Sequence, residues 1–142
     1  RNSNYFSAST PTVFSGTDFP LFRLADAYLM YAECVVRGGS GGTLNQAVDY
    51  VNALRTRSNA TTITPGQLTL DFIIDERARE LNLEGHRRSD LIRFGKFTGG
   101  SYLWPWKGNT LNGTSIPSTY KVFPIPLTAL QANPNLTQNP GY

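Results

Sequence analysis

One charged stretch limits what this chain can fold into more than any other part of its sequence. Residues Asp75–Phe97 read DERARELNLEGHRRSDLIRFGKF, with acidic and basic side chains interleaved with apolar ones at helical spacing. Together with the residues before it, this stretch predicts a helix over 70–84. Gly85 permits a break, and a shorter helix over 87–94 follows. A helix-break-helix element over 68–97 is therefore expected, with these residues on its buried face: Leu70, Ile73, Ile74, Ala78 and Leu81.

The charges of this stretch can be interpreted as a metal site or as a structural network. A metal site is disfavoured, because the chain has a single histidine and no HExxH pair. Helix spacing instead predicts ion pairs from Asp75 and Glu76 to Arg79. Arg77 lies close to the apolar stripe and is expected to form a forked contact with a carboxylate. We interpret six residues as this structural network: Arg77, Glu80, Glu84, His86, Arg87 and Asp90.

No catalytic arrangement is predicted. His86 follows the glycine break and is expected to be a hydrogen-bonded structural histidine rather than a general base. No serine, cysteine or second histidine is placed for a triad, and the paired carboxylates lie along a helix face instead of across a cleft. We therefore expect a protein that is not an enzyme and that uses no cofactor or metal.

Residues 19–57 predict a helix hairpin. A first helix over 19–37 would be capped by Asp18 and would place these apolar residues on one stripe: Leu21, Leu24, Tyr28, Tyr31, Ala32 and Val35. A second helix, Thr43–Arg57, would be capped by Thr43, with this stripe: Leu44, Ala47, Val48, Val51 and Leu54. The short link between the helices favours an antiparallel pair similar to a tetratricopeptide unit.

Composition excludes several classes of protein. The net charge of +3 comes from 13 basic and 10 acidic residues that are mostly interleaved, so no nucleic-acid-binding stripe is expected. No apolar run is long enough to span a bilayer. Cys34 is the only cysteine and is expected to be a buried, inert thiol. Residues 1–18 are polar and turn-rich, which predicts an irregular lead-in. Because the chain opens on Arg1, we expect a fragment of a longer protein.

Residues 98–142 are expected to form a loop-rich tail. The part from Lys96 to Tyr120 is rich in Gly, Ser, Thr, Asn and aromatic residues, and contains both tryptophans of the chain. Sugars present C–H faces that stack on aromatic rings, while amides and charged donors bind their hydroxyls. The glycan-binding candidates are Tyr102, Trp104, Trp106, Lys107 and Asn109. The alternative is that Trp104-Pro105-Trp106 anchors the loop onto the helices.

Three segments resemble the SusD/RagB family. The first is Asp75–Phe97, which matches the family's Glu-Arg-x-Arg-Glu-Leu, Glu-Gly-His-Arg, Asp-Leu-Ile-Arg and Gly-Lys pattern. The second is the ending FPIPLTALQANPNLTQNPGY, with its Pro-Ile-Pro, Asn-Pro-Asn-Leu and Gln-Asn-Pro-Gly-Tyr elements. The third is Phe22–Ala32, with the order Arg-Leu-Ala-Asp-Ala-Tyr-Leu-x-Tyr-Ala. Together these segments cover most of residues 20–142, and their combination is specific.

The resemblance implies a mainly α fold of tetratricopeptide-like helix hairpins with long irregular loops. Residues 1–142 would be the carboxy-terminal part of the larger α-helical domain. The family implies a lipoprotein on the bacterial outer membrane that binds polysaccharide or oligosaccharide and sits on a SusC-like TonB-dependent transporter. Contact with the membrane would come only from a lipid anchor outside this chain. In starch-binding members the stacking aromatics lie largely amino-terminal to this part.

Two other functions compete with glycan capture. The helix pair could be a tetratricopeptide-like interaction module that docks on the transporter, without direct glycan contact in this chain. A hydrolase is the third reading, and the residues do not support it.

Overall fold

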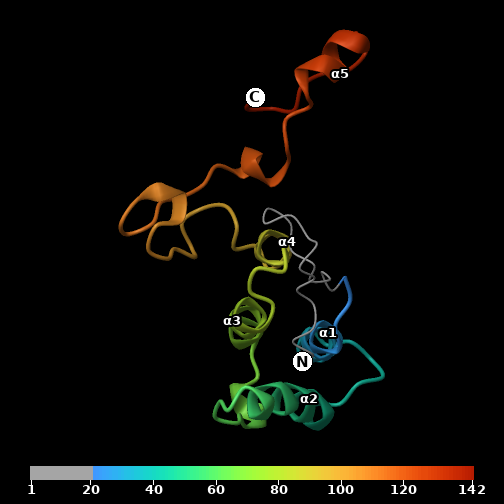
Figure 1. The fold of residues 1–142 in the computed structure, drawn as a ribbon, viewed down its shortest axis with the longest axis vertical. Coiled ribbons are helices and arrows are strands. Elements are labelled where there is room, and N and C mark those ends of the chain that lie inside the picture. The colour runs from blue at the N-terminus through green and yellow to red at the C-terminus, as the bar shows by residue number, and fades with distance from the viewer. Residues whose placement is uncertain (1–20) are drawn as a thin grey trace, which may run out of the picture. The chain divides into compact units, whose positions relative to one another are not determined.

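The computed structural model describes residues 21–142, and this part of the chain is mainly helical (Figure 1). The elements are α1 Leu24–Val36, α2 Leu44–Arg57, η1 Pro65–Gln67, α3 Leu70–Glu80, α4 Arg87–Arg93, η2 Lys107–Asn109, η3 Ser118–Lys121 and α5 Leu127–Ala132, where η marks a 3-10 helix. Within residues 21–142 the extended pairing is limited to one isolated bridge, Gly99 to Ile116. The chain divides into two compact units, Arg1–Leu70 and Asp71–Tyr142. The predicted mainly α class is confirmed.

The helix α1 begins later than its apolar pattern predicts. Its first residue is Leu24, after Arg23 in an extended conformation, and the predicted cap Asp18 lies outside the described residues. Leu21 and Leu24 are 75% and 66% exposed, so their predicted place on the buried stripe is wrong. Spacing counted them because they continue the helical period, although Leu21 precedes the helix. The residues that are buried are Ala25, Leu29, Ala32 and Glu33.

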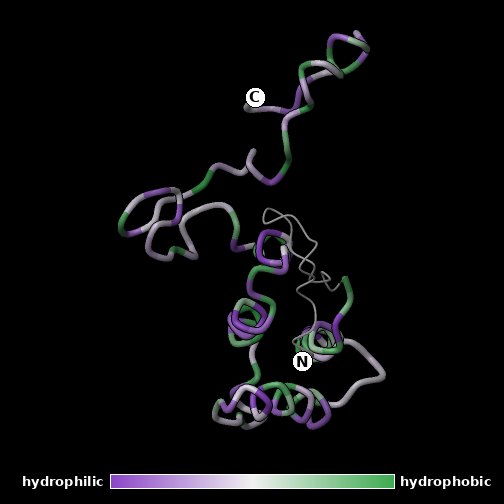
Figure 2. The backbone as a smooth tube through the Cα atoms, in the orientation of Figure 1, coloured by the Kyte–Doolittle hydropathy of each residue, from purple (hydrophilic) through white to green (hydrophobic). Residues whose placement is uncertain are grey.

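Cys34 is exposed, which corrects the prediction of a buried thiol. The residues before it, Ala32 and Glu33, are buried. At about 100° per residue, position 34 lies roughly half a turn from the mean direction of the buried positions. The apolar character of the surrounding sequence concealed this, because α1 carries apolar residues on more than one face. Figure 2 shows hydrophobic and hydrophilic positions alternating around α1.

The helices α1 and α2 form the expected hairpin. They pack against each other, and Thr43 caps α2 by accepting a 3.2 Å hydrogen bond from the Gln46 amide. Tyr50 stacks on Tyr28 with ring centroids 4.2 Å apart and meets Tyr31 edge-on at 5.1 Å. The Tyr31 hydroxyl accepts a 3.1 Å bond from the Thr43 amide at the start of α2. Tyr31 near the end of α1 thus meets the start of α2, while Tyr28, one turn earlier, meets Tyr50 farther along α2, as an antiparallel pair requires.

The core of the hairpin unit is built from small and branched apolar residues. On α2, Ala47 and Val51 are fully buried and Val48 and Leu54 nearly so, as predicted, whereas Leu44 is 43% exposed. The segment after α2 is held by Asn52, whose amide exchanges two hydrogen bonds of 2.7 and 2.9 Å with the backbone of Ile63. This pairing brings Ile63 and Leu68 into the buried set.

The helix α3 ends at Glu80, four residues before the predicted end. Residues 81–85 form a turn instead, in which Leu83 and Gly85 have φ of 63° and 79°. A left-handed φ ends a right-handed helix. The sequence indicates such an angle at Gly85 but not at Leu83, because leucine rarely adopts it. On the buried face, Ile73, Ile74 and Leu81 are inside, while Leu70 and Ala78 are half-buried. The shorter helix α4 ends before Gly95, as predicted.

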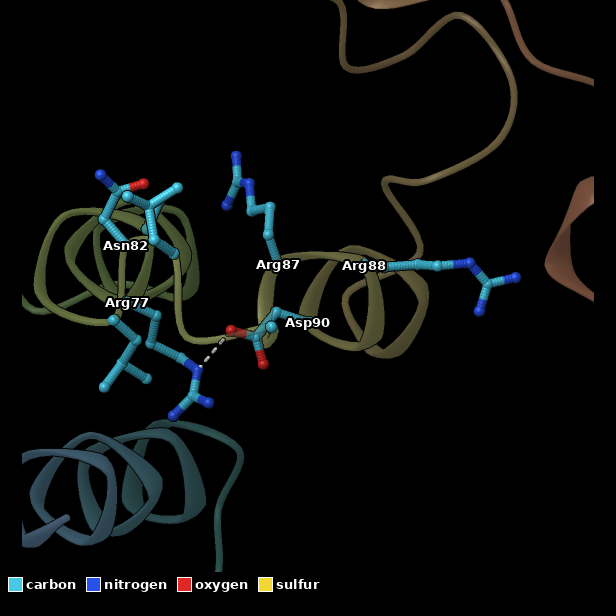
Figure 3. Close-up of a pocket in the computed structure, with 9 residues that line it drawn as sticks. Arg77, Asn82, Arg87, Arg88 and Asp90 are labelled. Atoms are coloured by element: carbon cyan, nitrogen blue, oxygen red, sulfur yellow. Dashed lines mark hydrogen bonds and ion pairs between the residues drawn. The ribbon is translucent and has the colours of Figure 1, made fainter. Parts of the chain in front are cut away.

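A buried ion pair joins α3 to α4. The Arg77 Nε donates a 2.8 Å hydrogen bond to Oδ2 of Asp90, and both side chains are almost completely buried. Arg93, one turn farther along α4, donates a 3.0 Å bond to the other oxygen, Oδ1. Figure 3 shows Arg77 reaching from α3 toward Asp90 on α4. The predicted carboxylate partner of Arg77 is therefore Asp90, thirteen residues away in sequence.

We predict that Arg77→Ala lowers the free energy of unfolding by about 3–5 kcal/mol, because it leaves the buried Asp90 carboxylate without its main cation. Urea unfolding followed by circular dichroism measures this change. The matched control is Asp71→Ala on the same helix, whose side chain is 80% exposed and pairs with Lys96 at 2.5 Å. It should cost no more than about 1 kcal/mol. Equal losses in the two variants would contradict a structural role for the Arg77–Asp90 pair.

Candidate functional site

The aromatic loop that follows α4 is closed at its base and braced within. The Gly99 amide donates a 2.8 Å bond to the Ile116 carbonyl, which joins the two ends of the loop. Inside the loop, Gly113 has a φ of 75°, and a Cβ there would lie 2.5 Å from the carbonyl oxygen of Trp104. Only glycine satisfies both conditions at position 113. The loop is therefore an ordered element in which the segment at Gly113 lies directly against the segment at Trp104.

Tyr102 ties this loop to both helices of its unit. Its hydroxyl donates a 2.9 Å bond to Oδ1 of Asp75 on α3 and accepts a 3.1 Å bond from Nη2 of Arg87 on α4. Arg87 also donates to the Ile74 carbonyl at 3.1 Å. The predicted ion pair between Asp75 and Arg79 is not among these contacts. Asp75 instead accepts the hydrogen bond from the Tyr102 hydroxyl, while Arg79 pairs with Glu76 at 2.6 Å.

Trp104 lies in a cluster of cationic and aromatic groups. The Lys107 ammonium lies 4.7 Å from the Trp104 ring centroid, and the Arg87 guanidinium carbon lies 6.0 Å from it. The Tyr102 ring is 5.6 Å away at an interplanar angle of 58°. The indole is half-buried. These contacts bring Trp104 together with two of the other predicted binding residues, Tyr102 and Lys107.

Lys107 is buried to 1% exposure, although it carries an ammonium group. Its Nζ donates to the Tyr102 carbonyl at 2.6 Å and to the Lys96 carbonyl at 3.3 Å, and it faces the Trp104 ring. Among residues 21–142, no carboxylate pairs with it. Burial lowers the pKa of this ammonium below its ordinary value of 10.5. Lys107 therefore stabilises the loop from inside and cannot donate to a ligand at the surface.

Trp106 and Asn109 differ from the other three candidates because both are exposed. Trp106 is 63% exposed, and it has a left-handed φ of 71°. Asn109 is also exposed, with a φ of 61°. The structure thus brings Tyr102, Trp104 and Lys107 together against the helices. It leaves the side chains of Trp106 and Asn109, which flank Lys107 in one turn, exposed to solvent.

The contacts that sequence spacing did not predict come mainly from two arginines of α4. The charge pattern places Arg87 in the structural network and predicts no role for Arg88, yet the partners of these two residues lie 13 to 33 residues away. Arg88 donates 3.0 Å bonds to the carbonyls of Tyr120 and Lys121, and its guanidinium lies 4.3 Å from the Phe123 ring centroid. The run of basic residues on α4 is the one signal that pointed to such contacts.

The carboxy-terminal tail folds back on itself. The Gln138 amide exchanges hydrogen bonds of 2.8 and 2.9 Å with the backbone of Ile125. Asn139 donates to the Phe123 carbonyl at 2.7 Å, and the Tyr142 hydroxyl donates to the Val122 carbonyl at 2.9 Å. The Asn-Pro-Gly-Tyr ending is therefore a structural clasp that depends on side-chain amides.

A pocket of about 460 Å³ lies where α3 gives way to α4 (Figure 3). It is lined by Arg77, Ala78, Leu81, Asn82, Leu83, Gly85, Arg87, Arg88 and Asp90. In Figure 3, Arg77 points toward Asp90, whereas Arg88 extends away from it. None of the five glycan-binding candidates lines this pocket. The cations here bind acceptors of the protein itself, which is typical of structural groups.

The part of the chain that the structure describes contains no group of three or more His, Cys, Asp or Glu residues able to hold a metal ion. No helix in that same part is both long and apolar enough to cross a membrane.

Comparison with known proteins identifies a single family. The sequence model described as the SusD family matches residues 2–142. The starch-binding protein SusD of Bacteroides thetaiotaomicron is 47% identical over 146 residues, which is 98% of this chain and 25% of that protein. The SusD-like protein P25 of Formosa agariphila is 40% identical over 132 residues, covering 86% of this chain and 24% of that protein. The chain thus spans about a quarter of the length of these relatives.

Solved structures agree with this result. A SusD superfamily protein from Bacteroides vulgatus aligns with a TM-score of 0.67 and 34% identity, covering 85% of this chain and 27% of that one. The surface glycan-binding protein A of Bacteroides uniformis aligns with a TM-score of 0.67 and 29% identity over the same shares. The helical architecture described above is therefore shared with proteins of known structure.

We predict that the buried Lys107 makes stability depend on pH. Between its lowered pKa and 10.5, the unfolded chain binds this proton more strongly than the folded chain does, so the free energy of unfolding rises with pH in that window. The Lys107→Met variant should lack this rise, which amounts to at most about 1.4 kcal/mol per pH unit. Urea unfolding of both proteins between neutral pH and pH 10 measures the difference. Lys121→Met, at an exposed lysine, is the control and should keep the wild-type pH dependence. A difference between wild type and Lys107→Met that does not change with pH would contradict the prediction.

Proposed function

The chain belongs to the SusD family, and from this premise we propose that it serves non-catalytic capture of polysaccharide or oligosaccharide at the bacterial cell surface. The captured glycan would be delivered to a SusC-like TonB-dependent transporter in the outer membrane. Attachment to the membrane would come from a lipid anchor that lies outside this chain. Residues 1–142 would form the carboxy-terminal part of the family's larger domain.

The observation that carries this proposal is the close relative named for starch binding, which aligns over nearly all of this chain. A structural neighbour named as a surface glycan-binding protein supports the same class of ligand. Because the chain spans about a quarter of these proteins, the function of the whole protein stays a proposal. The glycan that this protein takes can differ from the one named for a relative.

The aromatic loop after α4 is the part of this chain that we propose for glycan contact. Of the five predicted candidates, the buried Lys107 supports the loop from inside, which leaves Tyr102, Trp104, Trp106 and Asn109 for contact. Stacking of sugar C–H faces on aromatic rings needs rigid, partly exposed rings on an ordered loop. The bridge between Gly99 and Ile116 and the brace at Gly113 supply that order. Such contacts bind without chemistry, and so the proposal includes no reaction and no cofactor.

We predict that the protein is retarded in native gels that contain its glycan, and that the double variant Trp104→Ala/Trp106→Ala is not. Removing both indoles takes away the stacking surface of the loop, and a loss of about tenfold or more in affinity abolishes visible retardation. Affinity electrophoresis across starch and several other polysaccharides measures this. Met30→Ala, at an exposed position of α1, is the control and should migrate as the wild type does. If the double variant is retarded as strongly as the wild type, the loop is not part of the binding site. If no glycan retards the wild type, glycan capture is contradicted.

A second candidate function is docking on the transporter through the hairpin of α1 and α2, without glycan contact in this chain. The observation that favours it is apolar exposure at the start of the hairpin unit. Leu21 is 75% exposed, Phe22 95% and Leu24 66%, all within four residues at the start of α1. Exposed apolar side chains that gather in one place are typical of interaction surfaces. A tetratricopeptide-like pair that presents such residues suits protein recognition.

We predict, for this second function, that Phe22→Ser/Leu24→Ser reduces co-purification of the protein with its transporter and leaves retardation by glycan unchanged. Replacing exposed phenylalanine and leucine removes apolar area from the contact without opening a cavity in the core. Affinity purification of the tagged protein from native membranes measures the transporter yield. Leu83→Ser, at a residue 92% exposed in the other unit, is the control. Undiminished transporter yield from the double variant would contradict docking through this surface.

A further inference from the structure

The two tryptophans of the loop have different surroundings, although a single proline separates them. Trp104 is half-buried among Tyr102, Arg87 and Lys107, whose groups lie 4.7 to 6.0 Å from its ring. Trp106 is 63% exposed, and among residues 21–142 no ring or cation contact is recorded for it. A ring that is held by cations and by another ring supports the loop. A ring that faces solvent is available to a ligand.

The backbone at Trp106 is in a conformation that its side chain does not favour. Its φ is 71°, a region that glycine and asparagine adopt readily and that a bulky residue rarely does. Two hydrogen bonds fix the turn: the Trp106 amide donates to the Thr110 carbonyl at 2.9 Å, and the Asn109 amide donates to the Trp106 carbonyl at 3.0 Å. The Trp106 side chain is 63% exposed, so little packing offsets the cost of this backbone angle, and such outliers concentrate at functional sites.

The loop that carries this turn has almost no charged side chains. Over residues 97–120 the sequence has a single charged residue, Lys107, and its ammonium is buried beneath the loop. Two cations that contact other rings of the loop also bind groups of the protein: Lys96 pairs with Asp71 at 2.5 Å, and Arg87 donates to Tyr102 and Ile74. An acidic glycan needs cations to offset the desolvation of its charges, and the loop presents none of its own at the surface. A neutral sugar needs only an apolar ring and amide groups.

We propose that Trp106 is the ring on which the ligand stacks, and that the ligand is an uncharged pyranose glycan. The exposed Asn109 amide lies in the same turn and would bind a sugar hydroxyl. Trp104, Tyr102 and Lys107 then position the turn without touching the sugar. This inference rests on the proposed glycan capture and narrows it to one ring and one class of ligand.

The test compares three proteins by calorimetric titration of the full chain with soluble polysaccharides. The panel contains neutral glycans, such as amylopectin, laminarin and galactomannan, and acidic ones, such as alginate and polygalacturonate. Trp106→Gly removes the ring and also suits the left-handed backbone, so its thermal midpoint should equal or exceed that of the wild type. Its affinity for the neutral glycan that the wild type binds should fall about tenfold or more. Leu111→Ala, at an exposed apolar residue of the same loop, should stay within about twofold of the wild type.

The possible outcomes separate the inference from the function beneath it. Wild type that binds no glycan of either class overturns the proposed capture, and this inference with it. Wild type that binds a neutral glycan, with Trp106→Gly unchanged, overturns the role of Trp106 and leaves capture intact. Preference for an acidic glycan, weakened by salt, overturns the uncharged ligand class. A lowered thermal midpoint for Trp106→Gly would mean that the ring is structural, and would overturn its assignment to the ligand.

Discussion

The buried pair of Arg77 and Asp90 is the interaction on which the rest of the second unit depends. It fixes α4 against α3 across the turn in which Leu83 and Gly85 have left-handed backbone angles. Asp90 lies one helical turn after Arg87, so fixing Asp90 also fixes the direction in which Arg87 leaves α4. Arg87 then reaches Tyr102 and sets where the aromatic loop begins. An error at the pair would therefore be passed on to the loop, although the two do not touch.

Charge is used throughout this unit to set geometry. Asp90 is shared between two arginines, Arg88 binds two successive carbonyls of the tail, and Lys107 binds two carbonyls beneath an indole. A buried ion pair contributes little net stability compared with apolar packing, but removing one partner is costly. Such contacts therefore favour one arrangement over its alternatives more than they add stability. This suits a segment in which most residues after α4 lie outside regular helices.

Sequence periodicity was enough to predict the helices but not their partners. The apolar stripe of α2, its cap at Thr43 and the break at Gly85 were all readable, because each depends on residues within a few positions of one another. The start of α1 and the outward direction of Cys34 were not, since apolar residues continue past the face that is buried. The contact of Tyr102 with Asp75 spans 27 residues, and no local pattern encodes it. The same limit applied to the glycan candidates, which spacing grouped together.

The sequence Trp104-Pro105-Trp106 shows why that grouping could not be resolved without coordinates. Proline sets the residue before it in extended backbone, and the residue after it can turn either way. Here it turns into the left-handed region, and its indole is 63% exposed, whereas Trp104 is half-buried. Lys107, the next residue, is buried, and its ammonium lies 4.7 Å from the Trp104 ring centroid. The turn at Trp106 thus separates a tryptophan that contacts a cation from one that faces solvent, and the burial of Lys107 removes the loop's single charge from the surface that a ligand would meet.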